Sequence, residues 1–241
     1  MTAQPGNIVL VHGAYHGGWC WRRVADRLQR RGHRVFTPTL TGLADRAHLL
    51  HPDVTLSTHV QDVVNLVLWE DLEDVVLCGH SYGGMVITGV AERLAQRIRA
   101  IVYLDALKPE AGRCLLDYAD PAARPHLEAA MRAGPLRPLP ATAFNVNEAD
   151  LAWVDAKMTP HPPLTFTESL PSVEGRESIA RKIYVYASGY DSHLFRTFAE
   201  ETARDPSWQC LGMDGGHDLM IDSPDDVAGI LDGAASDSVQ P

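Results

Sequence analysis

The sequence lacks several features that would each point to a particular class of protein. It has no apolar run near the roughly 20 residues that a helix needs to cross a bilayer. It is also short of basic side chains, with 21 lysines and arginines against 31 aspartates and glutamates, a formal net charge of −10. This balance disfavours non-specific binding to nucleic acid or to an anionic membrane, so we expect neither as a partner.

Cysteine is scarce as well. The four cysteines form no C-x-x-C pair and no zinc-binding pattern, so no metal site is expected. Met1–Gly6 is short and polar and is followed directly by a strand-like run, unlike a signal peptide. These absences together predict a cytoplasmic protein with reduced thiols.

The order of apolar patterns predicts an α/β fold. The 241 residues, 45% of them hydrophobic, suit one α/β domain with an insertion rather than two independent domains. Short apolar runs alternate with amphipathic helical patterns, which predicts a mainly parallel, doubly wound sheet whose ligands bind beyond the carboxyl ends of the strands. Strands are expected at 7–12, 33–38, 75–78, 100–104, 182–187 and 208–213.

The texture of the sequence changes between residues 113 and 176. Prolines become frequent, strand-like runs disappear, and helical patches remain at 121–133 and 148–157. Such a stretch is too long for a plain connection inside a compact domain. We therefore predict an inserted helical lid at 113–176, with 1–112 and 177–241 forming the core. The alternative is an irregular surface excursion.

A candidate nucleophile lies in Gly79-His80-Ser81-Tyr82-Gly83, which matches G-x-S-x-G. The pattern also occurs by chance in loops, but here an apolar strand precedes it and an amphipathic helix follows. A serine at such a junction sits on a sharp, strained turn that exposes its hydroxyl. The two flanking glycines avoid collisions where strand and helix approach each other. We therefore interpret Ser81 as a nucleophile.

A serine hydroxyl needs a base to take its proton, and imidazole suits this role near neutral pH. His217 is the best candidate, because it follows the last strand in a glycine-containing loop and can reach over the sheet edge. His80 is adjacent to Ser81, but we expect it to point away and to pack beside the turn. Asp218 is expected to face solvent or the lid, and His59 to be a surface or lid residue.

A carboxylate must orient this base, and two candidates remain. Asp191 follows the strand at 182–187, which suits the chain order serine, acid, histidine. Asp105 lies at the tip of the strand at 100–104 and could reach the same imidazole, although it could instead cap a turn. We favour Asp191 and keep Asp105 as the alternative.

The remaining site residues are expected in the glycine-rich loop after the first strand and in the lid. The backbone N–H groups of Tyr82 and Ala14 are the candidate donors to the oxyanion that forms on an attacked carbonyl. Gly13 and His16 shape the same loop and are candidate substrate contacts. Trp153 in the lid would face a substrate, or would anchor the lid to the body.

Several motifs together resemble a known family. They are H-G-A-x-H-G-G-W-C-W, L-T-G-L-x-D-R-x-H-L, G-H-S-Y-G-G, V-Y-L-D-A and G-G-H-D-L-M. The chain from about residue 7 to 231 resembles bacterial α/β-hydrolase-fold esterases, similar to pyrethroid-hydrolysing carboxylesterases and, more remotely, to plant methyl esterases and hydroxynitrile lyases. The resemblance implies a serine carboxylesterase with a catalytic triad, acting through an acyl-enzyme without metal or cofactor. Carried residue by residue, it gives Ser81 as nucleophile, His217 as base, and Ala14 and Tyr82 as oxyanion donors.

Two departures from the lyases bear on the activity. Those enzymes carry a threonine where this chain has Gly13, and a lysine where it has Asp218. The lysine stabilises a leaving cyanide that an aspartate would repel, so lyase activity is disfavoured. The expected function is hydrolysis of small to medium carboxylic esters; the alternatives are a lyase or other non-hydrolytic enzyme, or a low-turnover receptor. A homodimer is compatible with the sequence.

Overall fold

A computed structural model describes residues 5–236. Most of the N-terminal segment Met1–Gly6, whose polar character is noted above, lies outside the described residues. Within that range no helix combines the length and the apolar character that crossing a membrane would require.

One sheet of six strands forms the centre of the molecule, with every neighbouring pair parallel, in the order β2-β1-β3-β4-β5-β6. The predicted strands are therefore confirmed, with the second shorter and the third and fourth longer than expected. Their bounds are Asn7–Val11 (β1), Arg34–Phe36 (β2), Val75–His80 (β3), Ile98–Leu104 (β4), Arg181–Ala187 (β5) and Trp208–Met213 (β6).

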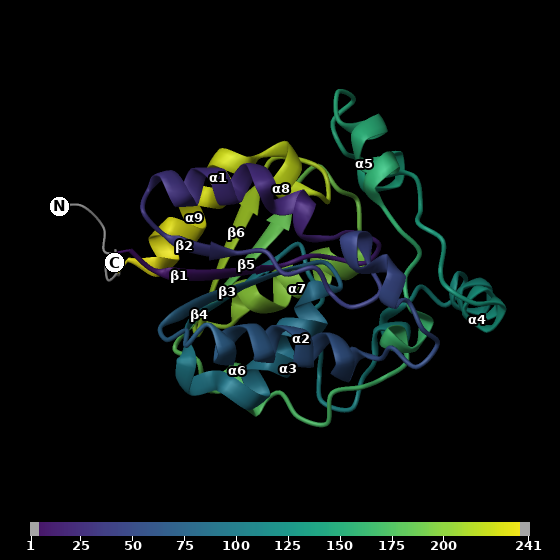
Figure 1. The fold of residues 1–241 in the computed structure, drawn as a ribbon, viewed down its shortest axis with the longest axis horizontal. Coiled ribbons are helices and arrows are strands. Elements are labelled where there is room, and N and C mark those ends of the chain that lie inside the picture. Colours follow the sequence, from purple (N-terminus) through teal and green to yellow (C-terminus); the bar gives the residue numbers. More distant parts are fainter. Residues whose placement is uncertain (1–4, 237–241) are drawn as a thin grey trace.

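Helices cover both faces of the sheet (Figure 1). One face carries α1 (Arg22–Arg30), α8 (Leu219–Asp222) and α9 (Pro224–Ala235), and the other carries α2 (Leu56–Trp69), α3 (Gly83–Leu94), α6 (Glu174–Ser178) and α7 (His193–Arg204). Successive strand residues point to opposite faces, so Val9 enters one hydrophobic core and Ile8 the other. Burial on both faces explains why the strands read as continuous apolar runs.

Residues 113–176, the segment that the sequence predicts to be an insertion, lie between β4 and β5 and reach beyond the carboxyl ends of the strands (Figure 1). We keep the name insertion for this segment. The two helical patches that the sequence predicts there appear as α4 (Arg124–Ala133) and α5 (Leu151–Lys157). The rest of the insertion is built from short 3-10 turns and irregular chain, as its proline content favours.

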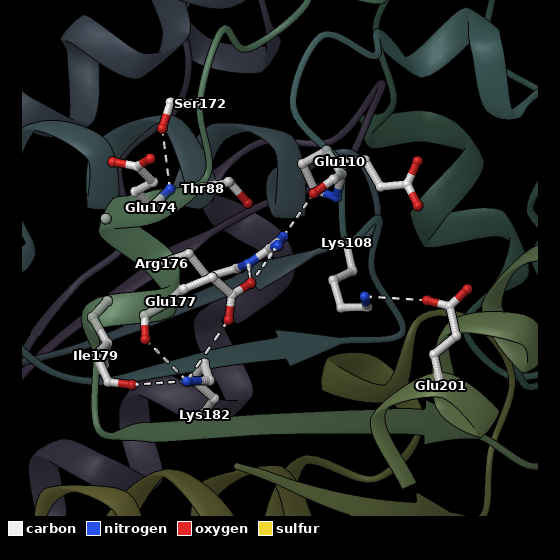
Figure 2. A network of polar contacts seen from close by, with 12 residues as sticks. Thr88, Lys108, Glu110, Ser172, Glu174, Arg176, Glu177, Ile179, Lys182 and Glu201 are labelled. Atoms are coloured by element: carbon white, nitrogen blue, oxygen red, sulfur yellow. Dashed lines mark hydrogen bonds and ion pairs between the residues drawn. The ribbon is translucent and has the colours of Figure 1, made fainter. Parts of the chain in front are cut away.

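A cluster of charged side chains closes the base of the insertion (Figure 2). The guanidinium of Arg176 donates to the carbonyl of Pro109 at 2.7 Å and to the carboxylate of Glu177 at 2.6 and 2.8 Å. Lys182, near the start of β5, donates to the carbonyls of Glu177 and Ile179. We call Arg176, Glu177 and Lys182 the base cluster; it ties the end of the insertion to the chain just before its start.

Candidate active site

Ser81 lies between β3 and α3 in a strained backbone conformation, with φ of +52°. This left-handed region is costly for a residue other than glycine, asparagine or aspartate, and such strain concentrates at functional sites. The turn is held by hydrogen bonds from the N–H groups of Gly84 and Leu107 to the Ser81 carbonyl. A Cβ atom on Gly83 would lie 2.7 Å from the carbonyl oxygen of Val11, so glycine is required there for the close approach.

His217 meets Asp105, not Asp191. The Nδ1–H of His217 donates to Oδ2 of Asp105 at 2.6 Å, and both side chains are buried. The other carboxylate oxygen of Asp105 accepts from the N–H of Ala187 at 3.1 Å. Asp105 itself has φ of +41°, a second left-handed residue at the carboxyl edge of the sheet. The strand tip thus fixes the carboxylate and the carboxylate fixes the imidazole.

The expected contact between Asp191 and His217 is wrong. The side chain of Asp191 is 91% exposed and binds Arg196 at 2.6 Å. The reason lies in the preceding backbone: the N–H of Ser188 donates to the carbonyl of Met213 at the end of β6, and the N–H of Gly189 donates to the carbonyl of Gly215 in the loop that follows. Those bonds lead the chain after β5 toward β6 and into solvent, away from the tip of β4.

Aromatic rings enclose the imidazole of His217. Tyr190 and Phe195 stack on it with ring centroids 4.8 and 5.0 Å away, and Phe144 of the insertion lies at 5.8 Å. A cavity of about 470 Å³ between β5, β6 and α7 is bordered by Tyr190, Phe195 and Asp105. The rings shield the bond between His217 and Asp105 from water, which strengthens it.

The glycine-rich loop after β1 passes directly over the elbow. A Cβ atom on Gly13 would lie 2.9 Å from both Nδ1 of His80 and Cβ of Ser81, so no larger residue fits without a shift. Among the described residues, no acceptor is assigned to the backbone N–H groups of Ala14 and Tyr82. Two unpaired donors therefore flank the elbow, as an oxyanion hole requires.

The insertion touches each of these loops. The carbonyl of Phe144 accepts from the N–H of His217 at 2.8 Å, and the N–H of Thr159 donates to the carbonyl of Tyr15 at 2.9 Å. Trp153 packs edge-on against Trp19 and under the guanidinium of Arg23. Through these contacts Trp153 anchors α5 to the loop after β1 and to α1. This is the second of the two roles that the sequence allowed.

Three further buried histidines surround the site in neutral, fully paired form. His59 was expected on the surface or in the lid, but it lies in α2, is completely buried and joins Tyr82 Oη to the carbonyl of Thr41. His12 accepts from Leu40 N–H and donates to a backbone carbonyl, and His161 is likewise paired at both ring nitrogens. Burial lowers the pKa of His12 to about 3 and that of His59 to about 4.

Behind His217 lies an ion pair that the sequence did not indicate. Nε2 of His16 donates to Oδ2 of Asp218 at 3.1 Å. Asp218 was expected to face solvent or the lid, but it is fully buried. Nε2 of His80 donates to the carbonyl of His217 at 3.0 Å, so His80 packs and bonds beside the elbow as predicted. We call His16 and Asp218 the rear pair. They are 202 positions apart, so no local pattern could reveal their contact.

Within residues 5–236, no group of three or more histidine, cysteine, aspartate or glutamate side chains is placed to hold a metal ion.

Comparisons with known proteins match the chain to a family and to a fold. A family model described as the alpha/beta hydrolase family matches residues 8–230. The chain is 43% identical to a carbendazim hydrolyzing esterase from Nocardioides sp. (strain SG-4G), over 92% of this chain and 96% of that protein. It is 35% identical to methylesterase 10 of Arabidopsis thaliana, over 44% of this chain and 39% of that one. The fold matches an extracellular alpha/beta-hydrolase from a Paenibacillus species with a TM-score of 0.84, at 24% identity, over 97% of this chain and all of that one.

Proposed function

The chain belongs to the alpha/beta hydrolase family, and on that premise we propose that it is a serine hydrolase that cleaves small to medium carboxylic esters through an acyl-enzyme on Ser81. The observation that carries the proposal is the 2.6 Å hydrogen bond between His217 and Asp105 at the sheet edge where the strained Ser81 elbow lies. A hydroxyl, an imidazole and an orienting carboxylate are the groups that acyl transfer needs.

In the first half of the proposed reaction, Ser81 Oγ attacks the ester carbonyl. Because Nδ1 of His217 is bonded to Asp105, Nε2 is the atom left to accept the serine proton. The negative charge on the carbonyl oxygen is met by the N–H groups of Ala14 and Tyr82, and loss of one such donor costs about 3 kcal/mol of transition-state stabilisation. The imidazolium then gives its proton to the departing alcohol.

In the second half, water replaces the alcohol. His217 takes a proton from that water, whose oxygen attacks the acyl carbonyl. The imidazolium then returns the proton to Ser81 Oγ as the bond from Oγ to the acyl carbon breaks, which releases the carboxylic acid and free Ser81. Asp105 stays ionised throughout and keeps Nδ1–H directed at itself, so that Nε2 remains the working atom.

The substrate class rests on the relatives and on the insertion. The bacterial relative is named for carbendazim and the plant relative for methyl esters, so both compounds are starting points for assay. The insertion contacts the loops that carry Ala14, Tyr82 and His217, which supports its role as the lid that lines the substrate pocket. We propose an ester with an apolar or aromatic body, because the side chains gathered there are Phe144, Phe195 and Tyr190.

The test compares the native protein with Ser81→Ala and a matched control, Ser178→Ala, an exposed serine on α6. Hydrolysis of p-nitrophenyl acetate and butyrate and labelling by a fluorophosphonate probe should disappear in Ser81→Ala alone. Native protein that neither turns over these esters nor takes the label would reject the proposal and favour a receptor. Cyanide release from a cyanohydrin would instead support a lyase.

We also propose a cytoplasmic location, which the four free cysteines support, since each keeps a reduced thiol. Detection of the protein in the culture medium, rather than in the cytoplasmic fraction of the source cells, would contradict this location. Whether the chain forms a homodimer can be measured by light scattering.

A further inference from the structure

His16 differs from the other buried histidines of the described residues in the partners of its two ring nitrogens. Nδ1 faces the carbonyl oxygen of Ala14 at 2.8 Å and Nε2 faces the carboxylate of Asp218 at 3.1 Å. Both are acceptors, so both nitrogens must carry a proton. His12 and His161 instead each pair one nitrogen with a backbone N–H, which requires the neutral ring.

The proton between His16 and Asp218 belongs on the imidazole. Ordinary pKa values of about 6.5 for histidine and 3.9 for aspartate favour the charged pair over the neutral one. Burial opposes charge on both groups, but each is the other's nearest counter-ion. The Asp218 carboxylate raises the pKa of His16 against the effect of burial, and His16 holds the pKa of Asp218 below its ordinary value.

We propose that the rear pair is a positioning device that fixes the oxyanion loop against the His217 loop and balances the Asp218 charge beside the catalytic imidazole. His16 binds the carbonyl of Ala14, whose N–H is the proposed oxyanion donor. Asp218 is the chain neighbour of His217. His80, next to the nucleophile, holds the carbonyl of His217. This inference rests on the proposed function, because the positioned atoms are those of the proposed reaction.

Balance of charge matters because Asp218 is close to the imidazole that must gain and lose a proton. With His16 charged, the rear pair is neutral as a whole. Without His16, a buried negative charge would stand beside His217 and would favour its imidazolium form. That form cannot accept the Ser81 proton, so the acid limb of the rate profile would move to higher pH.

The other titratable groups that face the rear pair do not change charge near neutral pH. Burial holds His12 and His80 neutral and keeps the Cys20 thiol and the Tyr190 hydroxyl protonated by raising their pKa. The remaining group is His217, the proposed base, and the experiment follows the pH dependence of the reaction it catalyses.

The experiment compares His16→Gln, Asp218→Asn and the double variant. Each single variant should lower kcat about 10- to 100-fold, while KM changes less than about threefold, because donors shift relative to Ser81 but the pocket stays. The acid limb of kcat/KM should rise by about one pH unit in His16→Gln. It should return to its native position in the double variant, where no charge remains to be balanced.

The chain supplies a control in another histidine–aspartate pair, whose imidazole is buried while the side chain of Asp232 is 28% exposed. His33 donates from Nε2 to Asp232 at 2.9 Å, and its side chain is as buried as that of His16, but it lies before β2 at the opposite edge of the sheet. His33→Gln should leave kcat within about twofold of native and the acid limb unmoved. An equal loss of kcat in His33→Gln and His16→Gln would reduce the rear pair to a structural role and overturn the inference.

A second readout does not depend on activity. Imidazole ¹⁵N NMR of the native protein at pH 7 should show His16 protonated at both nitrogens, and Asp218→Asn should return it to the neutral ring. A neutral His16 in the native protein would overturn the inference. Native protein without esterase activity or fluorophosphonate labelling would reject the proposed function, while the NMR result would still decide the state of the rear pair.

Discussion

The rear pair and the base cluster both bury charge against the same sheet, but they do so in different ways. In the base cluster, Arg176 and Lys182 find carbonyls or a carboxylate for their donors, and the acid, Glu177, is 46% exposed. In the rear pair both side chains are buried, yet Oδ1 of Asp218 and Nδ1 of the neighbouring His80 have no hydrogen-bond partner.

The backbone shows the same contrast. In the base cluster, none of Arg176, Glu177 and Lys182 has a positive φ. Near the site, Ser81 and Tyr15 have a positive φ, a conformation that is sterically unfavourable for both residue types. Unpaired polar atoms and strained backbone thus collect at the edge where chemistry is proposed, while the base of the insertion is fully paired. Changes at the first region should mainly lower activity, and changes at the second should mainly lower stability.

The largest expected effect is on the carboxylate that holds His217. Asp105→Asn should lower kcat about 10⁴-fold, because an amide can stabilise the wrong imidazole tautomer while preserving shape. Asp191→Asn, the same change at the exposed acid, should stay within about twofold. Steady-state kinetics on a nitrophenyl ester checks both. A severe loss in Asp191→Asn with little loss in Asp105→Asn would invert the assignment.

The choice between these two acids marks where prediction from sequence stops. Ser81 and His217 could be found because their signals are local: a G-x-S-x-G between strand and helix, and a glycine loop after the last strand. Asp105 and Asp191 each follow a strand, and which of them contacts His217 depends on the direction that the backbone takes after that strand. The contact between His16 and Asp218 is still harder to predict, since it joins the first and last loops of the sheet and has no motif.

Acid should destabilise the protein through the neutral histidines that surround the site. Burial lowers the pKa of His12 to about 3 and that of His59 to about 4. As the pH falls, these two histidines therefore become protonated in the unfolded chain before they do in the folded chain. Stability is therefore complete above pH 6.5 and is lost as pH falls toward those values. Each histidine should lower the free energy of unfolding by on the order of 2 kcal/mol as the pH falls from 7 to 5.

Urea unfolding at pH 7, 6 and 5 measures this loss directly. In His59→Gln the slope of unfolding free energy against pH should fall by about one proton, whatever the starting stability. A slope that is flat in the native protein between pH 6.5 and 5 would mean that these histidines are charged in the folded state.

At the base cluster we expect a loss of stability without a matching loss of rate. Arg176→Met removes the donors to Pro109 and Glu177 and should lower the free energy of unfolding by about 2 to 3 kcal/mol. Arg196→Met, which breaks an exposed ion pair with Asp191, should change it by less than about 0.5 kcal/mol. A fall in kcat for Arg176→Met as large as that for His16→Gln would erase the contrast between the two regions.

The last comparison is between glycine-to-alanine changes in two helices, α9 at the periphery and α3 behind Ser81, and it concerns stability alone. Gly229 lies exposed inside α9 with open space around it, so Gly229→Ala should stabilise the protein by about 0.5 to 1 kcal/mol through helix propensity. Gly89 lies inside α3, the helix behind Ser81, where a new Cβ would meet Val60 at 2.5 Å. Gly89→Ala should therefore destabilise by about 1 to 3 kcal/mol. Thermal unfolding of the two variants should give shifts of opposite sign; shifts of the same sign would mean that α3 is no more tightly packed than the periphery.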